Sequence, residues 1–207
     1  MPIKLNGATS GSVELGVPAT VSGGDVTLTL PTADGSAGQV LSTNASGALS
    51  FVNRVEWDQF QLIQNKSSNG TLTEWARCSY AGFGQVGGQM THSSGTWTFP
   101  STGHYLIIGR PTFSIDGADT CTMVVKVTTD NSTYTGAGKA YDGLNNSSAG
   151  TERYGSSAVF TFVDVTDTSN VKVQFEAESL SGNSNFLGGP SDTALFTTVT
   201  FIRLGDT

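Results

Sequence analysis

The side chains that could carry chemistry in this chain are few and widely spaced. The only histidines are His92 and His104, and the only cysteines are Cys78 and Cys121. A nucleophile with its base, or a zinc centre, needs several such groups at set spacings, and no GxSxG, HExxH or P-loop motif occurs. We expect His92, in THSSG, to be an exposed turn residue and His104 to open a strand. The cysteines are too far apart for a CxxC motif, so we expect two reduced core thiols.

Two further patterns are compatible with ligand binding but have a simpler interpretation. GFGQVGG at residues 82–88 has closely spaced glycines, as phosphate-binding loops do, but no helical pattern follows it, which favours a flexible loop. Asp116 with Asp119, and Asp164 with Asp167, could hold calcium at a loop. Aspartate also favours turns for its own hydrogen bonds, so we interpret both pairs as turn residues. The sequence predicts no enzyme, no metal site and no cofactor.

The sequence predicts that β-strands, and not helices, position the functional side chains of this chain. Gly accounts for 26 of 207 residues and charged residues for only 13%, and no segment keeps the apolar spacing of a helix for ten residues. Short β-branched and aromatic runs alternate instead with turn clusters such as SSNG and TDNS, which is typical of an antiparallel β-sandwich or jelly roll. The predicted strands are Val26–Leu30, Gln59–Ile63, Thr71–Arg77, Thr96–Phe99, His104–Gly109, Thr120–Thr129, Ser157–Val165, Val171–Glu178 and Thr193–Leu204.

Three of these strands are apolar on both faces. Val171–Glu178 is an ordinary half-buried strand, with apolar and polar residues in alternation. His104–Gly109, Ala158–Val163 and Ala194–Leu204 instead carry large apolar side chains on both sides, although a two-layer sandwich buries only one face of each strand. Either a long loop or a subunit interface must cover the second face. The candidate interface or core residues are Tyr105, Leu106, Ile108, Phe160, Phe162, Phe196, Phe201 and Ile202.

The composition changes near residue 53. No aromatic residue precedes Phe51, whereas all three tryptophans follow it, which predicts an N-terminal module over residues 1–53 and a core domain over 54–207. The net charge of −7 argues against nucleic acid and anionic membrane surfaces as partners. The N-terminus lacks the pattern of a secretory signal, and no window approaches twenty apolar residues, so we expect no membrane insertion.

The run TWTFPSTGHYLIIGR, from Thr96 to Arg110, carries a first resemblance. It is similar to the second main strand of the jelly rolls of the tumour-necrosis-factor and complement globular-head family. The later segments CTMVVKV, SAVFTFVDVTDTSNVKVQFEAES and TVTFIRL follow in the family's order, although the turn Asp167–Asn170 departs from the usual Gly-Asp. The resemblance covers Phe60 to Leu204, and it implies a ten-strand jelly roll assembled as a compact trimer.

The segment GSVELGVPATVSGGDVTLTLPTADGSAGQVLSTNASGALSF carries a second resemblance. It is similar to a repeat-like segment of tail fibres and other appendage proteins of bacteriophages, especially those of marine and cyanobacterial hosts. Such a segment buries too little surface alone to offset its ordering entropy, so it needs partners. Three intertwined copies, or a single copy laid along another virion protein, would supply them. The expected attachment residues are Ile3, Leu5, Val13, Leu15, Val26, Leu28 and Leu30.

Together the resemblances imply a viral structural protein on the surface of the phage particle. We expect a homotrimeric knob or fibre, fastened by its N-terminal module as a capsid decoration or head fibre. The alternative is a tail-fibre tip that recognises a host surface glycan or protein through loops at 81–92, 135–151 and 180–192. The candidate ligand residues in or beside these loops are Phe83, Tyr134, Tyr141 and Tyr154. A short chain without a shaft favours the capsid over the tail.

Overall fold

The computed structural model divides the chain into two compact units, Met1–Arg54 and Val55–Thr207. This division lies one residue from the boundary that the sequence predicts. The structure describes residues 3–6, 12–15, 27–36, 38–44, 46–53, 55–79, 85–117, 119–144, 152–181, 184–189 and 195–207. No helix that is long and apolar enough to cross a membrane occurs within these ranges.

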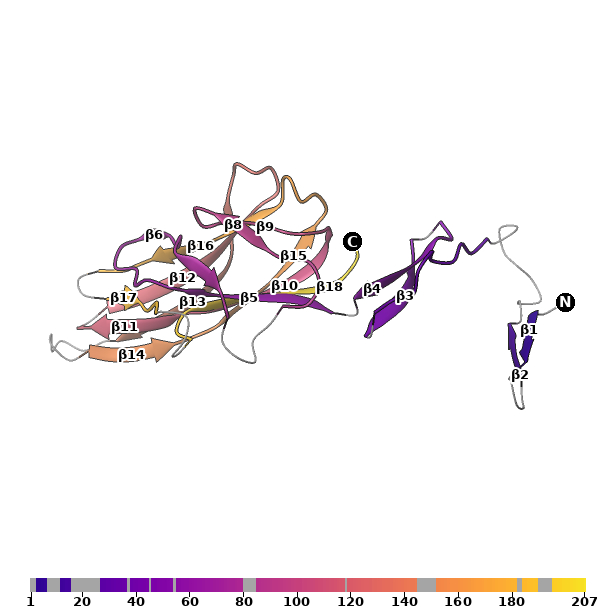
Figure 1. The fold of residues 1–207 in the computed structure, drawn as a ribbon. Helices are drawn as coiled ribbons and strands as arrows, with labels where there is room; N and C mark the ends of the chain where they lie inside the picture. Colours follow the sequence, from indigo (N-terminus) through magenta and orange to yellow (C-terminus); the bar gives the residue numbers. More distant parts are fainter. Residues whose placement is uncertain are drawn as a thin grey trace. The chain divides into compact units, whose positions relative to one another are not determined.

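The second unit consists of antiparallel sheets (Figure 1). One sheet has five strands in the order β15-β10-β18-β5-β7: Val159–Val165, Gly103–Arg110, Thr198–Gly205, Glu56–Leu62 and Trp75–Arg77. A second sheet has the order β13-β12-β16-β9-β8, with β6 paired to β16: Thr135–Leu144, Asp119–Thr128, Lys172–Glu178, Thr96–Thr98, Thr91–Ser93 and Gly70–Thr71. A small third sheet has the order β14-β11-β17: Glu152–Ser156, Thr112–Asp116 and Asn185–Phe186.

Aromatic rings fill the space between the two large sheets. Trp97 of β9 lies 5.0 Å from Phe201 of β18 and 4.5 Å from Phe60 of β5, measured between ring centroids. Phe175 of β16 meets the same Phe201 ring at 6.0 Å. Each of these residues is the inward member of an alternating strand, so the period-two pattern of the sequence generates this core.

Most of the predicted strands are present, with shifted ends. Thr71–Arg77 is divided between β6 and β7. In the predicted strand Thr193–Leu204, residues 193 and 194 lie outside the described residues, 195–197 are not strand, and β18 begins at Thr198. The prediction of a strand over Val26–Leu30 is wrong for the described residues 27–30: only Thr29 pairs there, through a parallel bridge to Ala48. Val26 itself lies outside the described residues.

The prediction of a loop over 135–151 is also wrong in its first part. Residues Thr135–Leu144 form β13, an edge strand paired along its length with β12. Its sequence, TGAGKAYDGL, gave little sign of a strand because glycines occupy several positions. At least one of them has a packing role, because a Cβ on Gly138 would lie 2.6 Å from side-chain atoms of Thr161 and Val159. The small residue lets β13 approach β15.

The first unit contains two hairpins. β1 (Ile3–Asn6) pairs with β2 (Ser12–Leu15), and β3 (Gln39–Thr43) pairs with β4 (Leu49–Asn53), both antiparallel. Asn44 closes the second hairpin, because its Oδ1 accepts hydrogen bonds from the N–H groups of Ser46 and Ala48. This use of an asparagine side chain to shape a turn is common in proteins.

Candidate functional site: the outer face of the five-stranded sheet

An apolar row crosses the outer face of the five-stranded sheet. In the strand register Phe162 of β15 lies opposite Leu106 of β10, Leu106 lies opposite Ile202 of β18, and Ile202 lies opposite Trp57 of β5. Side chains directly opposite on one face of an antiparallel pair are near neighbours. Four adjacent strands therefore contribute one continuous line of large apolar side chains.

A second row runs beside the first and becomes polar toward β5. Phe160 lies opposite Ile108, and Ile108 opposite Thr200, which in turn lies opposite Gln59. The Gln59 Nε2 donates a hydrogen bond of 3.0 Å to the Thr200 Oγ1. We call the six apolar side chains of the two rows the outer apolar face: Trp57, Leu106, Ile108, Phe160, Phe162 and Ile202.

This face is open to solvent in the single chain. Phe162 is 74% exposed and Phe160 63%, while Trp57, Leu106, Ile108 and Ile202 are half-buried. The inward neighbours Tyr105 and Ile107 are buried in the core, as are Val159 and Val163. A contiguous apolar patch of this kind marks an interaction site on soluble proteins.

Polar groups stand at one end of the outer apolar face. The His104 Nδ1 lies 3.7 Å from the Asp164 Oδ1, and both side chains are about half exposed. These residues form the next pair on the same face, two positions beyond Phe162 and Leu106 on the same two strands. An apolar centre with a polar rim is the usual composition of a protein interface.

The structure separates the eight candidate interface or core residues into three groups. Tyr105 and Phe201 belong to the core. Leu106, Ile108, Phe160, Phe162 and Ile202 lie together on the outer apolar face. Phe196 lies outside the sheet, 37% exposed, with its ring near Gly189. Trp57 was not among the candidates, because the predicted strand begins only at Gln59, three residues after the start of β5.

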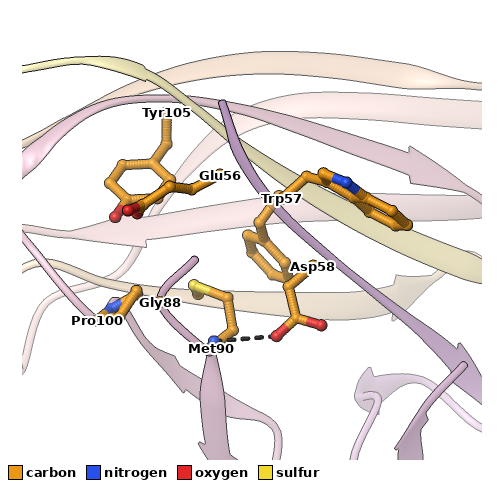
Figure 2. A pocket seen from close by; sticks show the side chains of 8 residues that line it. Glu56, Trp57, Asp58, Gly88, Met90, Pro100 and Tyr105 are labelled. Atoms are coloured by element: carbon orange, nitrogen blue, oxygen red, sulfur yellow. Dashed lines mark hydrogen bonds between the residues drawn. The ribbon is translucent and has the colours of Figure 1, made fainter. Parts of the chain in front are cut away.

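An ion pair between a buried carboxylate and a partly exposed guanidinium lies at the opposite edge of the same sheet. Asp58 of β5 is 1% exposed and accepts two hydrogen bonds of 2.9 Å from Arg77 of β7. Its Oδ2 also accepts the backbone N–H of Met90 at 3.0 Å (Figure 2). The Arg77 guanidinium lies 4.7 Å over the Phe60 ring, and the hydrogen bonds that it donates to the Asp58 carboxylate raise the pKa of Arg77.

The cavity beside this ion pair is too small for a substrate. Its volume is about 10 Å³, enough for about one water molecule. Figure 2 shows its wall, which is built by Glu56, Trp57, Asp58, Gly88, Met90, Pro100, Tyr105 and Phe201. With both carboxylate oxygens of Asp58 already engaged, the arrangement fastens the segment at Met90 to the sheet.

The other chemically capable residues are in structural positions. The expectation that His92 is an exposed turn residue is wrong: it lies half-buried in β8, its ring 4.7 Å from that of Trp97. Burial lowers its pKa. Cys78 and Cys121 are free and buried, and burial raises the pKa of each thiol to about 11.

The paired aspartates are engaged with nearby donors. The Asp119 carboxylate accepts hydrogen bonds from Thr120 and Ser181, and the Asp167 carboxylate accepts them from Ser169 and Asn170. Asp164 faces His104 instead of Asp167. Within the described ranges, no group of three or more His, Cys, Asp or Glu side chains is arranged to hold a metal ion.

The candidate ligand residues lie on strands more than on loops. Tyr141 of β13 is 70% exposed and Tyr154 of β14 is 68% exposed, with the Tyr154 hydroxyl donating to Glu152. Tyr134 is half-buried just before β13, and Phe83 lies outside the described residues. In the expected loop 180–192, Phe186 is in the core, 4.8 Å from Phe113.

The expected attachment residues fall on two segments of the first unit. Ile3 pairs with Leu15 and Leu5 with Val13 across the β1–β2 hairpin. Leu28 and Leu30 precede the second hairpin and are 60% and 71% exposed.

Comparison with solved structures identifies the fold of the second unit. The crystal structure of murine APRIL at pH 5.0 superposes with a TM-score of 0.54 at 14% sequence identity, covering 72% of this chain and 99% of that one. The structure of Eiger TNF from S. frugiperda gives a TM-score of 0.58 at 13% identity, covering 75% and 96%. The predicted jelly roll of tumour-necrosis-factor type is thereby confirmed. No protein-family model matches the chain, and no curated protein sequence matches it either.

Proposed function

We propose that this protein is a homotrimeric head displayed on the surface of a bacteriophage particle, as a capsid decoration or head fibre. The main support for the trimer is the outer apolar face, on which Phe160 and Phe162 are 63% and 74% exposed in a single chain. Burying one such side chain contributes about 1.5–3 kcal/mol, so three copies gain a large driving force by covering this face. The protein has no enzymatic role in this proposal.

A trimer is preferred to a dimer on the evidence of the fold. The run from Thr96 to Arg110 resembles a family of jelly rolls that assemble as compact trimers, and the fold of the second unit agrees with that resemblance. The polar pair His104 and Asp164 would lie at the rim of the contact, where solvent still reaches it.

The proposal that the protein belongs to a phage particle is based on the first unit. The segment from Gly11 to Phe51 resembles those of phage appendage proteins, and its short strands offer backbone donors and acceptors for pairing with a neighbouring protein. Three copies held together by the heads would bind such a surface with avidity. We propose that Ile3, Leu5, Val13 and Leu15 of the β1–β2 hairpin take part in this attachment, with other virion proteins as the partners.

A second candidate function is receptor binding at the tip of a tail fibre. The observation that favours it is the exposure of Tyr141 and Tyr154, since an exposed aromatic ring can stack on a sugar or pack against a host protein. Replacement of both tyrosines by serine would abolish adsorption of the virus to its host under this alternative. Unchanged adsorption would leave the structural role as the better account.

The attachment is tested on purified particles. A virus that encodes the full chain is compared with one that encodes a chain beginning at Arg54. Loss of the shortened protein from otherwise intact particles supports attachment through the first unit. Its retention at full occupancy contradicts that role and moves attachment to the jelly roll.

A further inference from the structure

The described residues of the segment 27–53 form a hairpin and its approach without a core of their own. Among its described residues, 27–36, 38–44 and 46–53, none is buried. A lone two-stranded hairpin in water is marginal at best, because hydrogen bonds between two strands do not offset the ordering entropy of the chain. A stable form of this segment therefore requires a covering partner.

Backbone contacts nevertheless hold the approach to the β3–β4 hairpin in a definite position against its turn. The Thr29 N–H donates to Gly47 O and the Leu49 N–H donates to Thr29 O, each at 2.8 Å, which holds the incoming chain against the hairpin turn. Gly47 has φ of 84°, and a Cβ at this position would lie 2.1 Å from the Thr27 carbonyl oxygen. These contacts hold the backbone of the segment in one conformation, but its apolar side chains remain exposed to solvent.

Those side chains lie on both faces of the hairpin. Leu41 of β3 is opposite Phe51 of β4, and Val40 is opposite Val52 on the other face. Leu41 is 50% exposed and Val52 40%. Beside them runs a groove of about 450 Å³, lined by Leu30, Pro31, Leu49 and Phe51 among others. The segment thus exposes apolar surface in several directions, as a chain surrounded by neighbours would.

Charge and connectivity favour further copies of this chain as those neighbours. Asp34 is the only charged residue between positions 27 and 53, so three copies would meet with little repulsion. Only residues 54 and 55 separate the end of β4 from the start of β5, so each hairpin is joined to the strand that carries Trp57 by a very short linker. A trimer of heads would therefore hold three hairpins at high effective concentration.

We infer that residues 27–53 of three copies pack together into an intersubunit collar, with Leu28, Leu30, Leu41, Phe51 and Val52 in its shared core. The inference rests on the proposed homotrimer, since the heads bring the hairpins together. It assigns this segment to self-association and leaves the β1–β2 segment before it for the attachment to another virion protein.

Disulfide cross-linking of the full chain tests the collar. Leu41→Cys places a thiol on the proposed shared core, whereas Ser46→Cys places a matched thiol on the exposed turn of the same hairpin. The native thiols of Cys78 and Cys121 are buried, with pKa values raised to about 11, so mild oxidation acts on the introduced cysteine. We expect about tenfold more covalent dimer from Leu41→Cys than from Ser46→Cys.

Sedimentation of the same samples separates the two proposals. A trimer in which Leu41→Cys cross-links preferentially supports both. A trimer with no cross-link, or with equal cross-linking of Ser46→Cys, overturns the collar and leaves the head trimer standing. A monomer overturns the proposed homotrimer and the collar with it.

Hydrogen exchange provides an independent measurement on the full chain. The double variant Leu28→Asp, Leu41→Asp should lose protection of the β3 and β4 amides while its heads remain trimeric, because it buries charge in the collar. The double variant Ser36→Asp, Ser46→Asp should keep that protection, since both positions are exposed. Equal protection in the two variants overturns the collar.

Discussion

Phe162 of β15 and Leu106 of β10 are directly opposite in the register of the five-stranded sheet, on the face that points away from the core. Their chain neighbours Thr161, Val163, Tyr105 and Ile107 point into the sandwich and are buried. The two faces of the same strands thus have the same apolar character but different surroundings, and the difference is the basis for expecting a partner on the outer one.

The first prediction concerns that outer face. Phe162→Asp should weaken trimerisation by at least about 100-fold, because a carboxylate replaces an apolar group that the trimer would bury. The fold of the single chain should be unaffected, since Phe162 is 74% exposed there. Sedimentation velocity across a concentration series measures the first effect and circular dichroism the second. Tyr141→Asp, at an exposed aromatic residue of the other sheet, is the matched control and should remain trimeric.

The second prediction concerns the ion pair between Arg77 and the buried Asp58. Asp58→Ala should lower the free energy of unfolding by about 3 kcal/mol, because it leaves the Met90 N–H and the Arg77 guanidinium without their shared acceptor. Urea denaturation at a fixed protein concentration measures the change. Lys139→Ala removes the solvent-exposed pair with Glu178 and should cost less than about 1 kcal/mol. Equal effects of the two substitutions would show that Asp58 does not fasten the Met90 segment.

The third prediction is a pH dependence that arises from His92. Burial lowers the pKa of His92 in the folded chain below its ordinary value of 6.5, so the unfolded chain binds more protons at this residue. The stability that neutral His92 contributes is therefore fully present above the unfolded pKa, and it is lost as the pH falls through the folded pKa. Urea unfolding should show falling stability from about pH 7 to about pH 5, and His92→Gln should flatten this slope. An unchanged slope in His92→Gln would exclude His92 as its source.

The fourth prediction is that the second unit folds alone. Among the residues that the structure describes, every member of the hydrophobic core lies between Phe60 and Phe201, so a chain that begins at Arg54 retains this core. It should unfold in one cooperative thermal transition. A broad transition without cooperativity would mean that residues before Arg54 complete the core.

The alternating strands of the sandwich were predictable because burial acts on every second side chain. The pattern in Val171–Glu178 is confirmed except at Lys172, which was expected on the solvent face and is 8% exposed, and the inward positions Tyr105, Ile107, Val159 and Val163 are buried as their alternation indicates. Strand β13 was not predictable in the same way, because its glycines carry no apolar pattern and one of them, Gly138, reflects the close approach of β15.

The contacts between distant residues could not be obtained from the sequence. Asp58 and Arg77 are nineteen residues apart, and they meet only because β5 and β7 pair in a particular register. His92 gave the pattern of a turn residue, but the pairing of β8 with β9 places it beside Trp97. Trp57 was missed because the first residues of β5 show no alternation of apolar and polar side chains that would mark where the strand begins.

Sedimentation equilibrium of the purified full chain at micromolar concentration tests the central claim most directly. For the proposed homotrimer we expect a single species with three times the mass of the 21.5 kDa chain. The chain beginning at Arg54 should also form trimers, because the outer apolar face lies wholly within the second unit. A full chain that sediments as a monomer would contradict the proposal that this face is a subunit interface.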